Sequence, residues 1–169
     1  MDAEELRSIQ APLKDRYRVE PDAARVTLRA SGALDSSLIA CNVKTGRALA
    51  AAGLHPATGG SGRELCSGDM LLEALVACAG VTLKAVATSI GVEVRAGGVL
   101  AEGDLDFRGT LGVARDAPVG FASIRLSFEL DTDASETQLE TLLKLTERYC
   151  VIFQTLNHKP ELSVASTRT

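Results

Sequence analysis

Residues 67–91 read SGDMLLEALVACAGVTLKAVATSIG, and this stretch organises the rest of the chain. It predicts a helix with Ser67 as its N-cap and with Gly91, a residue suited to the left-handed conformation, just past its end. Asp69 lies in the first turn, where the helix dipole favours negative charge. Apolar residues occupy nearly every side of this helix, so we expect it to be buried all round. It carries one thiol, Cys78, near its middle.

The same helix is about long enough to cross a membrane. Its composition argues against a membrane span, because Glu73 and Lys84 would each cost about 2.5 to 3.5 kcal/mol near the centre of a bilayer. Much of the run consists of Ala, Gly, Thr and Ser rather than Leu and Ile. We therefore predict no membrane partner.

The length of 169 residues, 46% of them apolar, predicts one domain at residues 24–169, preceded by a helical arm at residues 1–23. The net charge is −4 and there is no Trp, which argues against a nucleic-acid partner. The N-terminal residues are acidic and lack an apolar signal core, so we expect a cytoplasmic protein.

The four cysteines are widely spaced and form no Cys-x-x-Cys pair: Cys41, Cys66, Cys78 and Cys150. With only two histidines in addition, the chain has no framework for a zinc site. We predict no metal and no cofactor. In a reducing compartment we also expect no structural disulfide.

The first half of the chain predicts a helical arm followed by a three-stranded meander. Apolar spacing predicts a helix over residues 2–17 that is cut by Pro12. Alternation of apolar and polar residues predicts strands near residues 24–30, 38–43 and 48–54, with turns at residues 35–37 and 44–47. Residues 55–67 form a glycine-rich loop in which we expect His55 to be an exposed surface residue.

The second half predicts three more strands and a second long helix. The strands lie at residues 92–99, 102–113 and 122–130, and the last of these alternates most regularly. A capping box formed by Ser135 and Gln138 begins a helix that runs to Asn157, and residues 161–165 can form a short final strand. The pattern indicates an α+β fold.

Taken singly, each cysteine is most simply a small buried hydrophobe, because free Cys is among the most buried residue types. Cys78 lies midway along the first long helix, however, and Cys150 lies on the inward stripe of the second. If the two thiols meet, one thiolate can attack a peroxide oxygen and the other can resolve the sulfenic acid. A cation is needed to lower the pKa of the attacking thiol, and the candidates are Arg29, Arg47 and Arg63.

Four segments of the sequence resemble the osmotically inducible protein C and organic hydroperoxide resistance family (OsmC/Ohr). They are GGSG at residues 59–62, DMLLEAL at 69–75, ACAGVTL at 77–83 and CVIFQTL at 150–156. With the order of strands and helices, the resemblance covers most of the chain after residue 24. The two cysteine segments together carry most of it.

The resemblance implies an OsmC-like α+β fold in which antiparallel sheets surround two central helices of an intertwined homodimer. It implies a stress-response peroxidase that reduces organic hydroperoxides and is restored by a thiol reductant, such as the dithiol lipoamide. Cys78 resembles the attacking thiol and Cys150 the resolving one. Arg29 of the first hairpin and Asp69 at the start of the helix match the activating arginine and its partner acid, in a site built across the dimer.

Two features depart from the family pattern. Asp69 lies nine residues before Cys78, about 180° round a regular helix, so either the first turn is irregular or Asp69 only caps the helix. Val151 follows Cys150 where the family often has a proline that starts a new helix. An alternative function is therefore a scaffold that binds a small apolar ligand, and a further one is a role in subunit assembly for the arm at residues 2–17. Cys41, Cys66 and His55 have no matched role.

Overall fold

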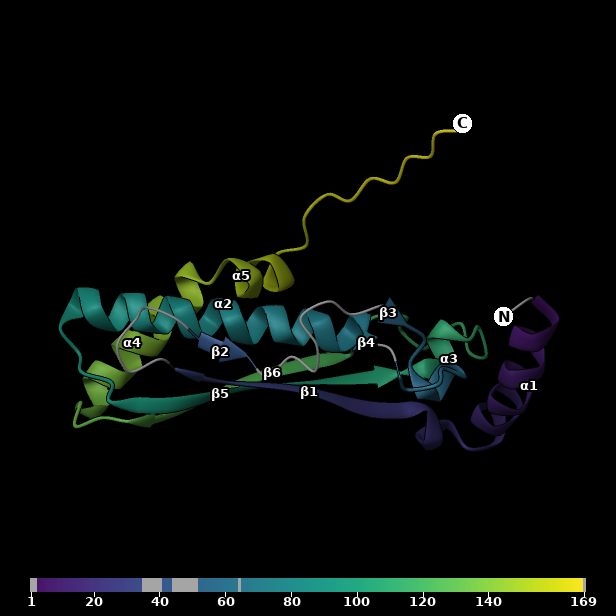
Figure 1. Cartoon of the computed structure of the whole chain (residues 1–169), viewed down its shortest axis with the longest axis horizontal. Coiled ribbons are helices and arrows are strands. Elements are labelled where there is room, and N and C mark those ends of the chain that lie inside the picture. The colour runs from purple at the N-terminus through teal and green to yellow at the C-terminus, as the bar shows by residue number, and fades with distance from the viewer. Residues whose placement is uncertain (1–2, 35–40, 44–51, 64, 169) are drawn as a thin grey trace.

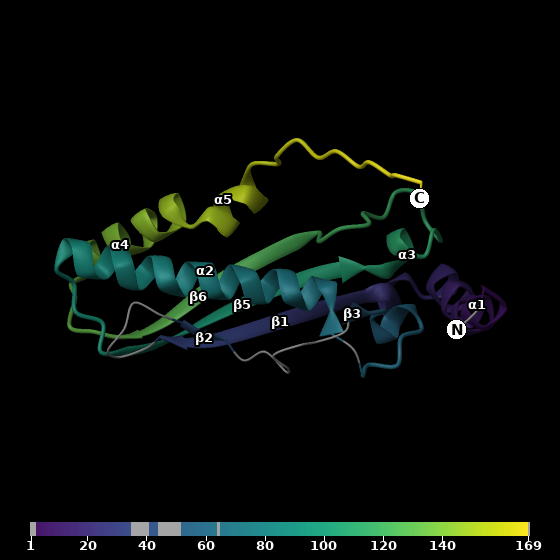
Figure 2. The same ribbon diagram turned by 45° about the horizontal axis from the view of Figure 1, so that its top comes forward.

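The computed structural model describes residues 3–34, 41–43, 52–63 and 65–168. The strands are β1 (Arg25–Leu34), β2 (Cys41–Val43), β3 (Ala52–Gly53), β4 (Leu65–Cys66), β5 (Ala96–Asp106) and β6 (Ser123–Asp131). The helices are α1 (Ala3–Val19), α2 (Ser67–Ile90), α3 (Phe107–Thr110), α4 (Glu136–Tyr149) and α5 (Val151–Asn157), with 3₁₀ turns η1 (Pro21–Ala24) and η2 (Pro56–Thr58). The long helix α2 lies along one face of the main sheet, and α4 and α5 lie beside it (Figures 1 and 2).

The main sheet is antiparallel and has the strand order β2-β1-β5-β6. The predicted α+β class is therefore confirmed. Strand β6 alternates between exposed and half-buried residues along its whole length, as its sequence predicts. Its inward side chains, Ile124, Leu126, Phe128 and Leu130, contact the hydrophobic core. This strand forms an edge of the sheet.

Helix α2 matches its predicted bounds. Gly91 takes the left-handed conformation (φ 71°) just past its end, whereas its N-cap is Cys66 rather than Ser67. The prediction that α2 is buried all round is wrong for the single chain. The sheet covers one face of the helix, and on another face Met70 and Val81 remain 41% and 40% exposed.

The composition of α2 makes it the one helix in the described part of the chain that is long and apolar enough to cross a membrane. Its most apolar window has a mean hydropathy of 1.8 and is 44% buried inside the chain. Core helices of globular proteins meet the same criteria, so this observation is weak evidence for a membrane span.

Two predictions for the first half are corrected. Helix α1 continues through Pro12, which removes one backbone donor but does not break this helix. Of the predicted third strand at residues 48–54, Ala52–Gly53 form β3, which pairs in parallel with β4 in a separate two-stranded sheet, and residues 48–51 lie outside the described residues. The predicted turns at residues 35–37 and 44–47 lie outside the described residues.

Three predictions for the second half are also corrected. The two strands expected within residues 92–113 form the single strand β5 and then α3, which begins where the Asp106 carboxylate accepts the N–H of Arg108 (3.1 Å). The helix expected over residues 135–157 begins at the predicted capping box but divides into α4 and α5. Residues 159–168 form no strand and extend away from the body (Figure 1).

Helix α1 packs on the loop that precedes α2. The Tyr17 hydroxyl donates to the carbonyl of Ala57 (2.7 Å), and the Gln10 amide donates to the carbonyl of Thr58 (3.3 Å). Gly59 allows this approach, since a Cβ at that position would lie 2.3 Å from Cγ2 of Ile9. The predicted arm therefore contacts the body of the protein through a specific loop.

Candidate functional site: a thiol pair on two helices

The structure brings Cys78 and Cys150 together. Cys78 lies in the middle of α2 and is half-buried, while Cys150 lies between α4 and α5 and is 1% exposed. Both are free thiols, and the Cys150 thiol is hydrogen-bonded to the sulfur of Cys78. Two thiols in direct contact can form a disulfide when one of them is oxidised.

Cys150 occupies a break between two helices. Its N–H donates to the carbonyl of Thr146 (2.9 Å) and closes α4, while its backbone is extended (φ −71°, ψ 107°). Its sulfur then accepts the N–H of Phe153 (3.5 Å), so that Cys150 is the N-cap of α5. A new helix therefore starts after the second cysteine even though Val151 stands at the next position.

The surroundings of Cys78 favour its thiolate. Burial raises the pKa of this thiol, but hydrogen bonds from the Ile152 N–H, the Cys150 thiol, the Val151 N–H and the Thr82 hydroxyl outweigh burial and hold the pKa below its usual range. For Cys150 the balance is reversed. Burial raises the pKa of Cys150 to about 11, the N–H of Phe153 opposes this rise, and the neighbouring Cys78 adds to it. Cys78 is therefore the thiol that ionises first.

The order in which the two thiols ionise predicts how their alkylation by iodoacetamide depends on pH. Because a thiol with a lowered pKa is ionised at lower pH, the rate of Cys78 alkylation should rise through a midpoint below that of an ordinary cysteine. Cys150 should stay protonated and unreactive across the same range. The rates can be read for each cysteine by mass spectrometry of its peptide, with Cys66 as an internal comparison. Faster labelling of Cys150 than of Cys78 would contradict this assignment.

Of the other two predicted site residues, Asp69 faces away from the thiols within one chain, and Arg29 is placed only by its backbone. Arg29 lies in β1 opposite Glu102, and its side chain lies outside the described residues. Asp69 lies in the first turn of α2, which is helical from Ser67 onward, so its side chain points about 180° away from Cys78. Of the alternative arginines, Arg47 lies outside the described residues and Arg63 is exposed in its loop.

Asp69 has a different neighbour, His55. Burial raises the pKa of Asp69 and the nearby His55 opposes that rise. The imidazole of His55 is half-buried, stacks on Phe107 (ring centroids 4.8 Å apart) and accepts the N–H of Ala57 at Nδ1 (3.0 Å). The prediction of an exposed loop histidine is wrong, because α3 packs an aromatic ring against this loop.

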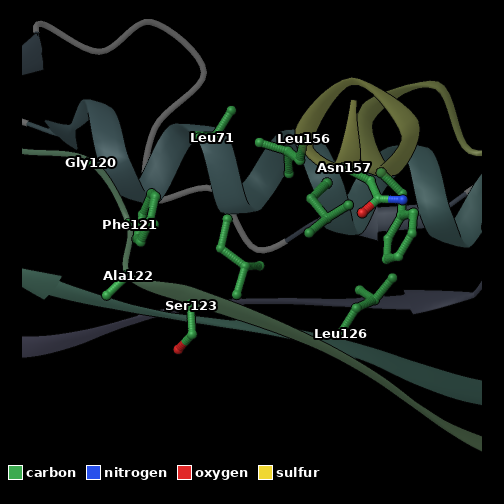
Figure 3. A pocket seen from close by; sticks show the side chains of 11 residues that line it. Leu71, Gly120, Phe121, Ala122, Ser123, Leu126, Leu156 and Asn157 are labelled. Atoms are coloured by element: carbon green, nitrogen blue, oxygen red, sulfur yellow. The ribbon is translucent and has the colours of Figure 1, made fainter. Parts of the chain in front are cut away.

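An apolar groove of about 500 Å³ is lined by residues of α2, α5 and β6 (Figure 3). Leu71 and Leu75 of α2 line it, and they share one face of the helix with Cys78, since residues three and four apart lie on the same side. Phe153 also lines the groove and borders a smaller hollow of about 170 Å³ that includes Cys150. The other residues that line the groove are Gly120, Phe121, Ala122, Ser123, Ile124, Leu126, Leu156 and Asn157. Phe153 therefore separates the groove from the hollow at Cys150.

Some groups that surround the thiols could not be identified from the sequence alone. The N–H groups of Val151 and Ile152 reach Cys78 only because α5 begins where it does. Thr82 is four residues after Cys78, a spacing that places both on one helix face and that was visible in the sequence. Within the described ranges, His, Cys, Asp and Glu form no group of three that could hold a metal ion.

Comparison with known proteins agrees with the fold. The chain is similar to a crystal structure of an OsmC-like hydroperoxide resistance protein from Jannaschia sp. CCS1, with a TM-score of 0.59 and 15% sequence identity, over 85% of this chain and 97% of that one. Similarity at that identity shows the fold alone. No curated protein matches the chain. The family model for OsmC-like proteins matches residues 60–165. Because this match includes both helices of the thiol pair and more than half of the chain, the protein belongs to the OsmC-like family.

Proposed function

We propose that this protein is a thiol peroxidase that reduces organic hydroperoxides through a Cys78/Cys150 dithiol–disulfide cycle. The observation that carries the proposal is the hydrogen-bonded contact between these two sulfurs, with the more ionisable thiol on α2. Membership of the OsmC-like family supports it. The similar structure from Jannaschia is also described as a hydroperoxide resistance protein.

In the first step, the Cys78 thiolate attacks the terminal oxygen of the hydroperoxide and the O–O bond breaks. The substrate leaves as an alcohol after taking up one proton, and Cys78 becomes a sulfenic acid. In the second step, the sulfur of Cys150 displaces the hydroxyl group, which leaves as water, and a disulfide forms. A thiol reductant, for which we propose a dithiol such as lipoamide, then returns two electrons and two protons.

Hydrogen-bond donors around Cys78 assist the first step by stabilising the thiolate. The N–H groups of Val151 and Ile152 are held by the backbone of α5 and need no rearrangement to stabilise the thiolate. Cys150 is held protonated by its burial, so that it does not compete as the attacking group. The apolar groove lined by α2, α5 and β6 favours a hydroperoxide with a hydrocarbon body over hydrogen peroxide.

We propose further that the protein acts as an intertwined homodimer in the cytoplasm. The outward face of α2 is formed by small and apolar residues: Met70, Ala74, Ala77, Val81 and Ala85. The tail after α5 is extended, and Leu162 and Val164 on it are 80% and 100% exposed. A second copy would cover both surfaces, and Arg29 and Asp69 can then serve the partner's thiols.

Titration of the reduced protein with cumene hydroperoxide and, separately, with hydrogen peroxide tests the proposed cycle. We expect two thiols per chain to be lost and a Cys78–Cys150 disulfide to be found by peptide mapping. The reaction should be faster with cumene hydroperoxide because of the apolar groove. Thiols that stay reduced in excess of both peroxides would refute the proposal.

The groove also favours a second candidate function, the binding of a small apolar ligand without catalysis. Native mass spectrometry of the purified protein distinguishes the two. A bound apolar molecule on a protein whose thiols survive peroxide would establish the scaffold function, whereas peroxide-driven disulfide formation would establish the peroxidase.

A further inference from the structure

The side chain of Gln154 crosses the break between α4 and α5. Its Nε2 donates to the carbonyl of Glu147, in the last turn of α4, over 2.8 Å. The last four carbonyls of a helix have no N–H partner within their own helix, so this carbonyl is open to a donor from outside. In the described part of the chain, it accepts the one side-chain hydrogen bond that joins α5 to α4. Gln154 therefore links the two helices across the break.

Gln154 also anchors Cys150 through its main chain. Its N–H donates to the carbonyl of Cys150 (2.9 Å) and closes the first turn of α5. On the other side of the break, the N–H of Cys150 donates to the carbonyl of Thr146 (2.9 Å). The sulfur of Cys150 accepts the N–H of Phe153 (3.5 Å). Cys150 is thus held by both helices, and the angle between them sets where its sulfur lies.

Helix α5 depends on links of this kind because it is short. It has seven residues, none of them fully buried, and an isolated helix of that length is marginal in water. Ile152 and Phe153 pack against the hydrophobic core, and α2 packs against both α4 and α5. The same core includes Cys150, and Cys78 packs against it. A change in the orientation of α5 relative to α4 would therefore move the sulfur of Cys150 relative to that of Cys78.

We propose that Gln154 is a positioning residue for the resolving thiol: its side chain fixes α5 against α4 and so holds the sulfur of Cys150 within reach of Cys78. The resolving step needs this approach, because a bond forms between the two sulfurs while the bond from Cys78 to its leaving group breaks. Holding two reacting atoms close together raises the rate of such a step. The role in peroxide turnover rests on the proposed function, whereas the rate at which the two thiols form a disulfide does not.

Methyl methanethiosulfonate tests this inference without peroxide. The Cys78 thiolate takes up the methylthio group and methanesulfinate leaves. Cys150 then forms the disulfide with Cys78, and methanethiol leaves with the proton of the Cys150 thiol. Acid quenching and intact mass spectrometry can follow both steps in a protein whose Cys41 and Cys66 are replaced by serine. The first step reports on Cys78 alone, and the second reports on the approach of Cys150.

Gln154→Met removes the amide and keeps a flexible side chain of similar length. We expect the second step to become about two- to five-fold slower, the effect of losing one hydrogen bond near the surface, and the first step to be unchanged. Gln154→Lys restores a donor of similar reach and should return the second step to the natural rate. Thr155→Val is the matched control, because the Thr155 hydroxyl also donates over 2.8 Å to a carbonyl, that of Val151, but within α5.

An unchanged second step in Gln154→Met would overturn the inference, as would a lysine variant as slow as the methionine variant or a Thr155→Val protein slowed to the same degree. If Gln154→Met does not fold, as judged by its circular dichroism, Gln154→Glu keeps the size of the side chain without a donor, and the same slowing is expected.

Oxidation of the natural protein by cumene hydroperoxide separates this inference from the proposed function. A slower second step in Gln154→Met, together with natural thiols that never react with peroxide, would support the positioning role and refute the peroxidase. An unchanged second step, together with disulfide formation driven by peroxide, would overturn the positioning role and leave the peroxidase standing.

Discussion

Cys78→Ser is expected to lower the rate of cumene hydroperoxide consumption by on the order of a thousand-fold or more, because a serine hydroxyl is not ionised near neutral pH and cannot replace a thiolate nucleophile. The reaction can be followed as loss of peroxide in the presence of a dithiol reductant. Serine is close in size to cysteine, so α2 and its contacts should be preserved. Loss of activity in this variant therefore reports on the chemistry of the sulfur.

Cys150→Ser should give a different result, because it leaves the attacking thiol in place. We expect one equivalent of peroxide to be consumed and a sulfenic acid to accumulate on Cys78, detectable by a dimedone adduct in mass spectrometry. Cys66→Ser is the matched control, since Cys66 is a half-buried free thiol at the start of the same helix. A Cys78→Ser protein with natural activity would refute the assignment, as would a Cys66→Ser protein that lost activity to the same degree.

Val81→Glu is expected to convert the protein from a dimer to a monomer. Val81 lies on the outward apolar face of α2 and is 40% exposed in the single chain, so a carboxylate there is well solvated in a monomer. In the proposed dimer, the same carboxylate would be buried without a partner charge, which costs several kcal/mol. The dimer should dissociate on the order of a hundred times more readily or more, as measured by light scattering across a dilution series.

Thr141→Glu is the control for this experiment, because it adds the same charge at an exposed position of α4. It should leave the mass in solution unchanged. A Val81→Glu protein that keeps the dimeric mass would show that α2 does not lie in the interface. A natural protein that is monomeric at all concentrations would refute the proposed dimer itself.

Local patterns predicted several elements correctly. Gly91 ends α2 in the left-handed conformation, Ser135 and Gln138 form the capping box of α4, and β6 alternates inward and outward residues. Each of these features depends on neighbours within about four residues, so the sequence contains all of the information needed. The family resemblance, carried by the two cysteine segments, is likewise a property of short stretches, and the match at residues 60–165 confirms it.

Other features depend on contacts between distant parts of the chain. The N–H groups at the start of α5 reach Cys78 only because α5 packs against the distant helix α2. His55 is half-buried because α3, about fifty residues later, supplies Phe107. The roles of Arg29 and Asp69 remain predictions, since Asp69 faces away from the thiols within one chain and the side chain of Arg29 lies outside the described residues.

The sequence by itself determined the α+β class, the bounds of the central helix and the two cysteines that can act together. It did so because hydrophobic periodicity and helix caps depend on residues that lie close together in the sequence. Only the tertiary structure decided that the two thiols touch, that Cys78 ionises before Cys150, and that one face of α2 stays exposed. Those properties arise from burial and from hydrogen bonds between separate elements, and a linear pattern does not encode which elements will meet.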